Sequence, residues 1–190
     1  MIDEAKSIWA GLEFRKPMLL RNIEPMSEVQ LRWIPGEGRA SIAWQLWHIA
    51  EVEDNWARQH ITNEPLHFPF GVQVREAGNS EYPSKEALIG YLHDVRKLSR
   101  VRLEEASPED FLRQVIDKDY EDLNVRGVWA GVITSFAWHA GQIALTAKLL
   151  PGTPVQTMQF GYWKDKAWRR GESGLKPDAD LSEFDSFPDA

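Results

Sequence analysis

The chain has 190 residues, no cysteine and nine tryptophans, and its 22 basic and 29 acidic side chains give a net charge of −7. Without cysteine the chain cannot itself supply a disulfide, a thiolate ligand for zinc, an iron–sulfur cluster or a thiol nucleophile. The acidic balance argues against a nucleic-acid-binding surface and against binding to anionic membranes. Length and composition are those of an ordinary soluble globular protein.

Neither a secretory signal nor a membrane span is expected. Acidic residues occupy positions 3 and 4, where a signal peptide would carry bases, and no apolar stretch follows them. The run 127–147 contains no Asp, Glu, Lys or Arg and is long enough to cross a bilayer, but polar residues interrupt it and no second run resembles it. We therefore expect a cytoplasmic protein in which this run is a buried helix.

The spacing of apolar residues, together with the positions of proline, glycine and N-cap residues, predicts two long helices in the first half of the chain. The first, 3–22, contains Pro17, which predicts a kink or an early break. The turn 33–38 then separates it from the second helix, 41–61, whose N-cap is a serine. A loop rich in proline and glycine follows over 62–83.

The second half begins with a helix capped by Ser84 that continues to about residue 105. Its charged face is expected to meet water; this face carries Lys85, Glu86, Asp94, Arg96, Lys97 and Arg100. A short helical turn over 107–112 and a loop over 117–126 lead to the last and most apolar helix, 128–150, which Pro151 and Gly152 stop.

These elements predict an all-α fold, a four-helix bundle over residues 1–150 with a long loop between its second and third long helices. The aromatic and charged extension 151–190 is expected to pack on the bundle or on a partner subunit, with its last residues mobile.

A polar stripe interrupts the apolar last helix: Ser135, His139, Gln142 and Thr146 recur at spacings of four, three and four. The second helix offers a counterpart in Gln45, His48, Glu51 and Asn55. Two buried histidines on facing helices make a minimal metal or acid–base site, while two hydrogen-bonded structural histidines are the alternative. The sequence gives less indication that His60, His67 or His93 belongs to a metal or acid–base site.

Two runs carry a resemblance to a known family. EPMSEVQLRWIPGEGRASIAWQLWHIAEVEDNW, residues 24–56, and SFAWHAGQIALTAKLLPG, residues 135–152, resemble the DinB-like (DinB/YfiT) superfamily of metal-dependent bundle proteins. The resemblance covers about residues 2–150. It implies metal ligands at His48 and His139, with the middle position of the family's triad, usually a histidine, occupied by Ser135.

The serine leaves two readings open, because a hydroxyl is a poor ligand for zinc or nickel. Either Glu51 or a water held by Ser135 completes the coordination, or metal binding is weakened or lost. In both cases a pocket is expected around the two histidines. Its predicted lining comprises Trp44, Gln45, Trp47, Glu51, Ser135, Trp138 and Gln142.

The resemblance implies a homodimeric enzyme, a transferase or hydrolase that acts on a small molecule. Its divalent metal, zinc or nickel, would activate water or the thiol of a low-molecular-weight cofactor. The alternative is a non-catalytic bundle with a degenerate metal site, which binds a small apolar ligand or acts through self-association. No nucleic acid or membrane partner is expected.

Overall fold

The structure, a computed structural model, describes residues 1–116 and 122–150. The extension 151–190, for which packing on the bundle or a partner was predicted, lies outside the described residues. The part of the chain described is helical and contains no strand, which confirms the predicted all-α fold. None of its helices is long and apolar enough to cross a bilayer.

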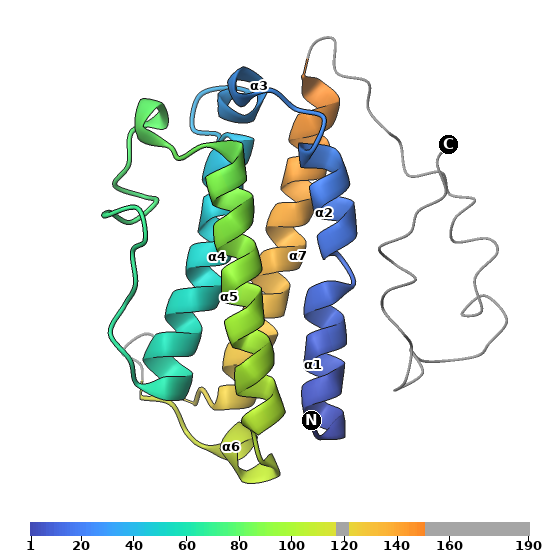
Figure 1. Ribbon diagram of the computed structural model, residues 1–190, viewed down its shortest axis with the longest axis vertical. Coiled ribbons are helices and arrows are strands. Elements are labelled where there is room, and N and C mark those ends of the chain that lie inside the picture. Colours follow the sequence, from blue (N-terminus) through green and yellow to red (C-terminus); the bar gives the residue numbers. More distant parts are fainter. Residues whose placement is uncertain (117–121, 151–190) are drawn as a thin grey trace, which may run out of the picture.

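The first predicted helix is divided in two, as Pro17 indicated. Helix α1 (Asp3–Glu13) and helix α2 (Lys16–Ile23) follow one another almost in line (Figure 1). Pro17 lies in the first turn of α2, where its missing N–H has no intrahelical partner to lose. Further inside a continuous helix, its ring would clash with the carbonyl of residue 13. The break therefore falls between the two helices.

A short helix that was not predicted, α3 (Glu28–Arg32), follows. Ser27 and Gln30 form a capping box: the Ser27 amide donates to Gln30 Oε1 at 2.9 Å, and the Gln30 amide donates to Ser27 Oγ at 3.3 Å. The serine and glutamine at this spacing are the sequence signal for such a cap. The neighbouring prolines and the shortness of the segment obscured it.

Helix α4 (Ile42–Ala57) begins at the predicted N-cap, since Ser41 Oγ accepts a hydrogen bond from the Trp44 amide at 3.2 Å. It ends in a π-helical turn, Arg58–Thr62. The predicted loop follows and includes one short 3₁₀ turn, Asn79–Glu81.

The second half contains α5 (Lys85–Glu105), the short α6 (Pro108–Leu112) and α7 (Val125–Leu149). Helix α7 starts three residues before the predicted position, because the side chain of Asn124 caps it by accepting from the Gly127 amide at 2.9 Å.

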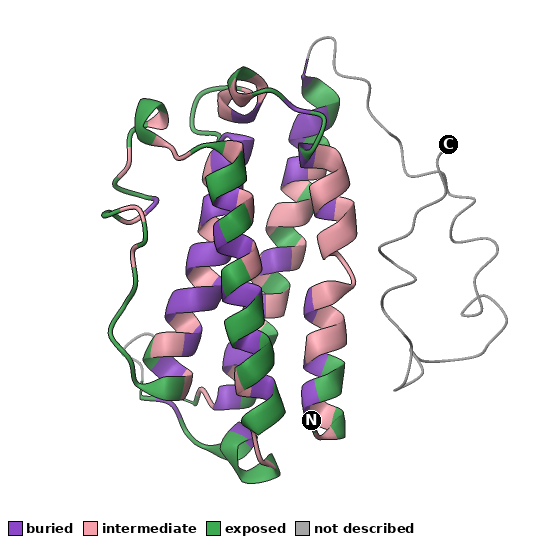
Figure 2. Cartoon of the chain, in the orientation of Figure 1, coloured by how far each residue is buried: buried purple, intermediate pink, exposed green. Residues whose placement is uncertain are grey.

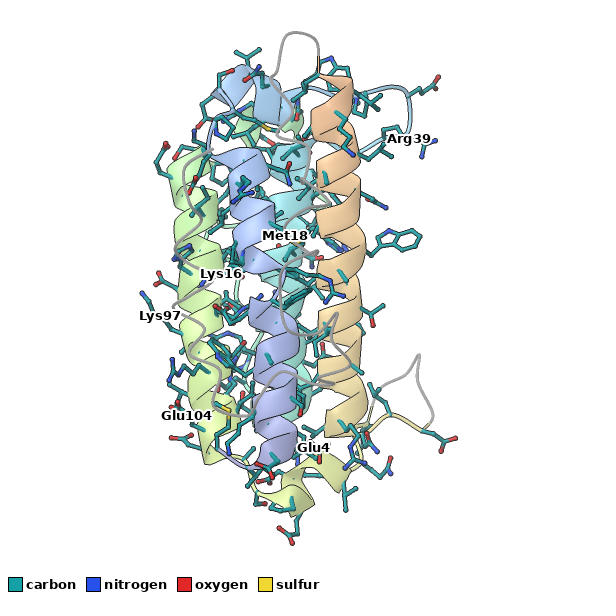
Figure 3. The ribbon with its side chains drawn as sticks, turned by 90° about the vertical axis from the view of Figure 1, so that its right-hand side faces the viewer. Glu4, Lys16, Met18, Arg39, Lys97 and Glu104 are labelled. Atoms are coloured by element: carbon teal, nitrogen blue, oxygen red, sulfur yellow. The ribbon has the colours of Figure 1, made fainter. Side chains whose placement is uncertain are left out.

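The long helices form a bundle in which α4 packs against both α5 and α7. Helices α1 and α2 lie one above the other between α5 and α7 (Figure 3). The buried residues face the inside of the bundle (Figure 2). Two apolar clusters fill it: one around Trp47 and Phe136, the other around Trp129 and Phe111.

One predicted outer residue of α5 is instead buried. Arg96 is 2% exposed and its Nη2 donates to Glu53 Oε2 at 2.9 Å. Glu53 Oε1 accepts from Ser99 Oγ at 2.6 Å, and the guanidinium lies 4.9 Å from the ring centroid of Phe136. The prediction that Arg96 meets water was therefore wrong. The charge is accommodated because an acid on α4 lies opposite it, which helical periodicity along α5 alone does not reveal.

Helix α7 can approach α4 closely at Gly131. A Cβ atom at this position would lie 2.5 Å from Cζ3 of Trp56, whereas a Cβ at Gly141 would meet no atom within 4 Å. We expect Gly131→Ala to cost about 1–3 kcal/mol, because the Trp56 ring must shift. Gly141→Ala should instead add about 0.5–1 kcal/mol by improving helix propensity. Urea denaturation of both variants checks this; equal stabilisation by both would contradict the tight contact.

Candidate functional site

The structure brings the two predicted histidines together. His48 on α4 and His139 on α7 have ring centroids 4.7 Å apart, with the ring planes at 71°. Trp44, one turn before His48 on α4, stacks on the His48 ring at 4.7 Å and 16°. It also lies 6.2 Å from the His139 ring. Helical spacing places Trp44 and His48 on one face, so the indole fixes the plane in which the imidazole lies.

Both imidazoles are held in their neutral form. Burial lowers the pKa of His48 to about 4, with further contributions from His139 and from the positive charge of Arg75. Burial also lowers the pKa of His139, an effect that the side chain of Gln142 partly offsets. At neutral pH each ring therefore carries one nitrogen lone pair that can bind a metal or accept a proton.

Two buried polar atoms near this face lack a hydrogen-bond partner within the described residues: His139 Nδ1 and Gln45 Oε1. Gln45 lies one turn before His48, and its Nε2 donates to the Ala40 carbonyl at 3.4 Å. An unpartnered buried nitrogen or oxygen is costly, so a water, an ion or a ligand is needed to satisfy it.

The other residues predicted to line the pocket differ in burial, and not all of them lie beside the histidine pair. Ser135 and Gln142 are half-buried on α7, whereas Trp138 is 67% exposed and lies mainly in solvent. Trp47 packs on the opposite side, against the rings of Phe70 and Tyr82. Of the three tryptophans expected beside the histidines, only Trp44 is stacked on one.

Glu51, one of the two proposed third ligands, is buried, and its carboxylate already accepts a hydrogen bond from the loop that follows α4. Its Oε2 accepts a hydrogen bond from the Val74 amide at 3.0 Å, and burial raises its pKa. Within residues 1–116 and 122–150, no group of three or more His, Asp or Glu is arranged as a metal site. The candidate site is thus a pair of histidines, with Ser135 one turn before His139 on α7.

Sequence reasoning missed Arg75, whose charge contributes to the lowered pKa of His48 and partly opposes the rise that burial causes in the pKa of Glu51. It lies in the loop after α4, where no helical periodicity relates it to His48. Its positive charge makes the surroundings of the histidine pair more favourable for an anion.

The stability of the metal-free protein should depend on pH through His48. Its pKa is about 4 in the folded protein against an ordinary value of 6.5, so the unfolded chain binds its proton first as the pH falls. The stabilisation is present at neutral pH and is lost between these two values, by about 2 kcal/mol once solvent screening is allowed for.

Urea denaturation with chelator present, near neutral pH and near pH 4, measures this loss. The His48→Gln variant cannot titrate at this position and should lose less stability than the wild type. The same loss in both proteins would mean that His48 titrates normally.

The described fold and site define an all-α bundle protein with a pair of neutral histidines between two of its long helices. The family model of the DinB superfamily matches residues 12–147, and the chain belongs to this superfamily. A conserved protein from Enterococcus faecalis of known crystal structure is 17% identical, with a TM-score of 0.61. The alignment covers 78% of this chain and 95% of that one, which is a likeness of fold. The curated proteins contain no match.

Proposed function

We propose that the protein is a metal-dependent enzyme whose divalent ion, zinc or nickel, is held by His48 and His139. The observation that carries this proposal is the approach of two neutral imidazoles, 4.7 Å between ring centroids, with His139 Nδ1 buried and unpartnered among the described residues. Neutral imidazole nitrogens are common ligands of both metals.

The spacing of the rings suits a shared ion. Two imidazoles on one zinc ion, with Zn–N bonds of about 2.0–2.1 Å and a tetrahedral angle, place their ring centroids about 5 Å apart. The observed 4.7 Å is close to this value. Two protein ligands leave the remaining coordination positions open for water or a substrate atom, as catalytic rather than structural metal sites require.

The bound ion would supply Lewis acidity, which lowers the pKa of a thiol or water so that its anion exists at neutral pH. The chain's own side chains prepare the site for such an anion. His48 and His139 stay neutral, Trp44 fixes the orientation of His48, and the charge of Arg75 favours a negative ligand. Because the chain contains no cysteine, a thiol nucleophile would come with a low-molecular-weight cofactor.

Cobalt substitution tests this proposal. The Co²⁺-loaded protein should show visible absorption bands of a nitrogen-coordinated, low-symmetry ion, and a small thiol should add a near-ultraviolet thiolate-to-cobalt band. His48→Ala should lose both signals, whereas His93→Ala, which changes a histidine on α5, should keep them. A wild-type spectrum equal to that of free aqueous cobalt would contradict the metal site; normal cobalt bands without a thiol response would contradict the thiol chemistry.

One observation favours a second candidate function, self-association. Trp138, Leu145 and Leu149 are exposed and, at spacings of seven and four residues, lie on one face of α7. An apolar stripe of this kind is a common feature of helix–helix interfaces. Sedimentation of the full chain should show a dimer that Leu145→Ser weakens; a monomer at the highest soluble concentration would contradict it.

A further inference from the structure

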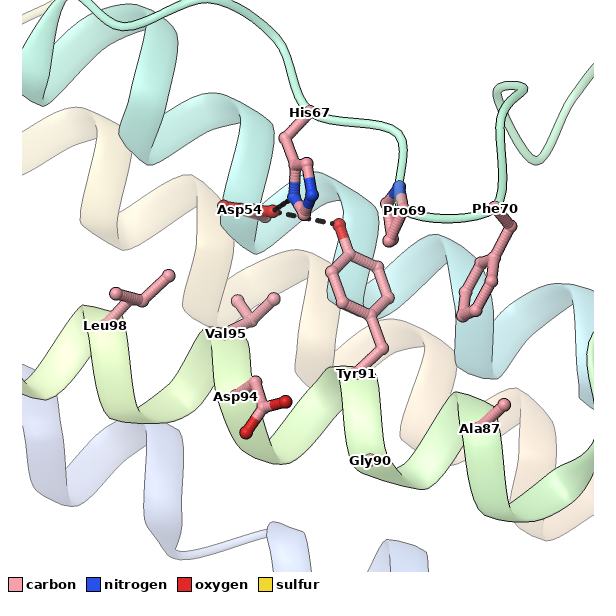
Figure 4. A pocket seen from close by; sticks show the side chains of 10 residues that line it. All are labelled: Asp54, His67, Pro69, Phe70, Ala87, Gly90, Tyr91, Asp94, Val95 and Leu98. Carbon is pink, nitrogen blue, oxygen red and sulfur yellow. Dashed lines mark hydrogen bonds and ion pairs between the residues drawn. The ribbon is translucent and has the colours of Figure 1, made fainter.

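A pocket of about 330 Å³ lies between α4, α5 and the loop that follows α4 (Figure 4). Asp54, His67 and Tyr91 provide its polar side. Neither His48 nor His139 lines it, so it is separate from the site described above. Its size lies at the lower end of the range for small-molecule sites.

Both the backbone and the ring of His67, a loop residue, are fixed by side chains of α4. Its backbone is clamped by Asn55 on α4, whose Nδ2 donates to the His67 carbonyl at 3.1 Å and whose Oδ1 accepts from the His67 amide at 2.7 Å. Its ring is fixed separately, because Nδ1 lies 2.7 Å from Oδ2 of Asp54. The two hydrogen bonds to Asn55 would be enough to hold the loop against α4. The contact with Asp54 therefore sets the orientation of the imidazole ring.

The contact with Asp54 determines which ring nitrogen is available. Asp54 is 1% exposed and its carboxylate also accepts from Tyr91 Oη at 3.1 Å and from Arg58 Nε at 2.8 Å. A carboxylate surrounded by donors requires a proton on Nδ1 of His67, so the lone pair of the neutral imidazole lies on Nε2. No described residue hydrogen-bonds to Nε2, and the side chain is 45% exposed.

The other walls of the pocket are apolar, and the charges around it are compensated. Phe70 and Tyr91 meet edge to face at 5.6 Å, and Leu98 on α5 extends the apolar surface. At the rim, Asp94 pairs with Lys97 at 2.8 Å. With Asp54 paired to Arg58, the pocket offers neither a free cation for an anionic ligand nor an uncompensated acid for a cationic one among the described residues.

We propose that this pocket is a second ligand site, for a small neutral molecule of the phenol type. The aromatic body packs against Phe70 and Tyr91, at the end of the pocket near Ala87 (Figure 4). The hydroxyl donates a hydrogen bond to Nε2 of His67. Asp54 orients the imidazole and stabilises the tautomer that accepts this bond.

Titration of the isotope-labelled full chain with 4-methylphenol, followed by NMR, tests the proposal. Amide signals around Phe70 and Tyr91 and the Nε2 signal of His67 should shift and saturate. Toluene, which has the same body without the hydroxyl, should bind about tenfold more weakly because it cannot make the hydrogen bond. His67→Leu should weaken binding of 4-methylphenol by a similar factor and leave toluene binding unchanged.

Ala87→Phe is the matched blocking variant, since Ala87 is an exposed residue of α5 that lines the pocket and takes no part in the Asp54–His67 contact. It should abolish saturable binding of both compounds. Unchanged binding in Ala87→Phe would place the ligand elsewhere and overturn the proposal. Toluene binding as tight as that of 4-methylphenol to the wild type would also overturn it, because His67 would then only fasten the loop.

Discussion

Replacing Glu53 by alanine should lower the free energy of unfolding by about 3–5 kcal/mol, because it leaves the Arg96 guanidinium buried without its nearest counter-charge. Both side chains are almost fully buried, and Glu53 also accepts the Ser99 hydroxyl at 2.6 Å. The second acid near Arg96, Glu13, is 3.3 Å away and partly solvated, so it compensates only in part. Urea denaturation at neutral pH measures the loss.

The matched control is Glu104→Ala, which removes the partner of Arg100 on the exposed side of α5 and should cost about 0.5 kcal/mol or less. The double variant Glu53→Leu/Arg96→Met replaces both buried charges by apolar groups and should recover most of the stability lost by Glu53→Ala. A cost below about 1 kcal/mol for Glu53→Ala would show that Arg96 reaches water without Glu53.

The second large effect concerns the position where the family's usual ligand is missing. Ser135 lies one turn before His139 on α7, so Ser135→His should place a third imidazole on the same face and tighten zinc binding about tenfold or more. His139→Ala removes one of two ligands and should weaken zinc binding about a hundredfold. Competition with a coloured chelator measures both affinities.

Thr134→His is the matched control for the added histidine. Thr134 is exposed on α7 beside Ser135, so an imidazole there points away from the histidine pair. It should leave zinc affinity unchanged apart from weak surface binding. If Ser135→His binds zinc no more tightly than Thr134→His, the α7 face does not form the metal site.

Much of the fold could be predicted because its signals are local. Serine caps at Ser41 and Ser84 and the break at Pro17 depend on neighbouring residues in the chain. The start of α7 was placed too late because Asn124 lies inside a polar stretch that reads as loop. Local signals also sufficed to place His48 and His139 on helix faces, and the packing of α4 on α7 brings the two rings together.

The features that escaped prediction depend on contacts between distant parts of the chain. Arg96 is buried only because Glu53 comes from another helix. His67 gave no signal as a loop residue, since its partner Asp54 lies 13 positions earlier at the end of α4. In the same way, nothing near Glu51 in the sequence indicates that the Val74 amide donates a hydrogen bond to its carboxylate.

The central claim, a metal ion held by His48 and His139, is tested most directly by elemental analysis of the purified protein after incubation with zinc or nickel and exhaustive dialysis. The account predicts about one ion per chain in the wild type and almost none in the His48→Ala/His139→Ala variant, with both proteins folded. A metal-free wild type, or equal metal content in the two proteins, would contradict it.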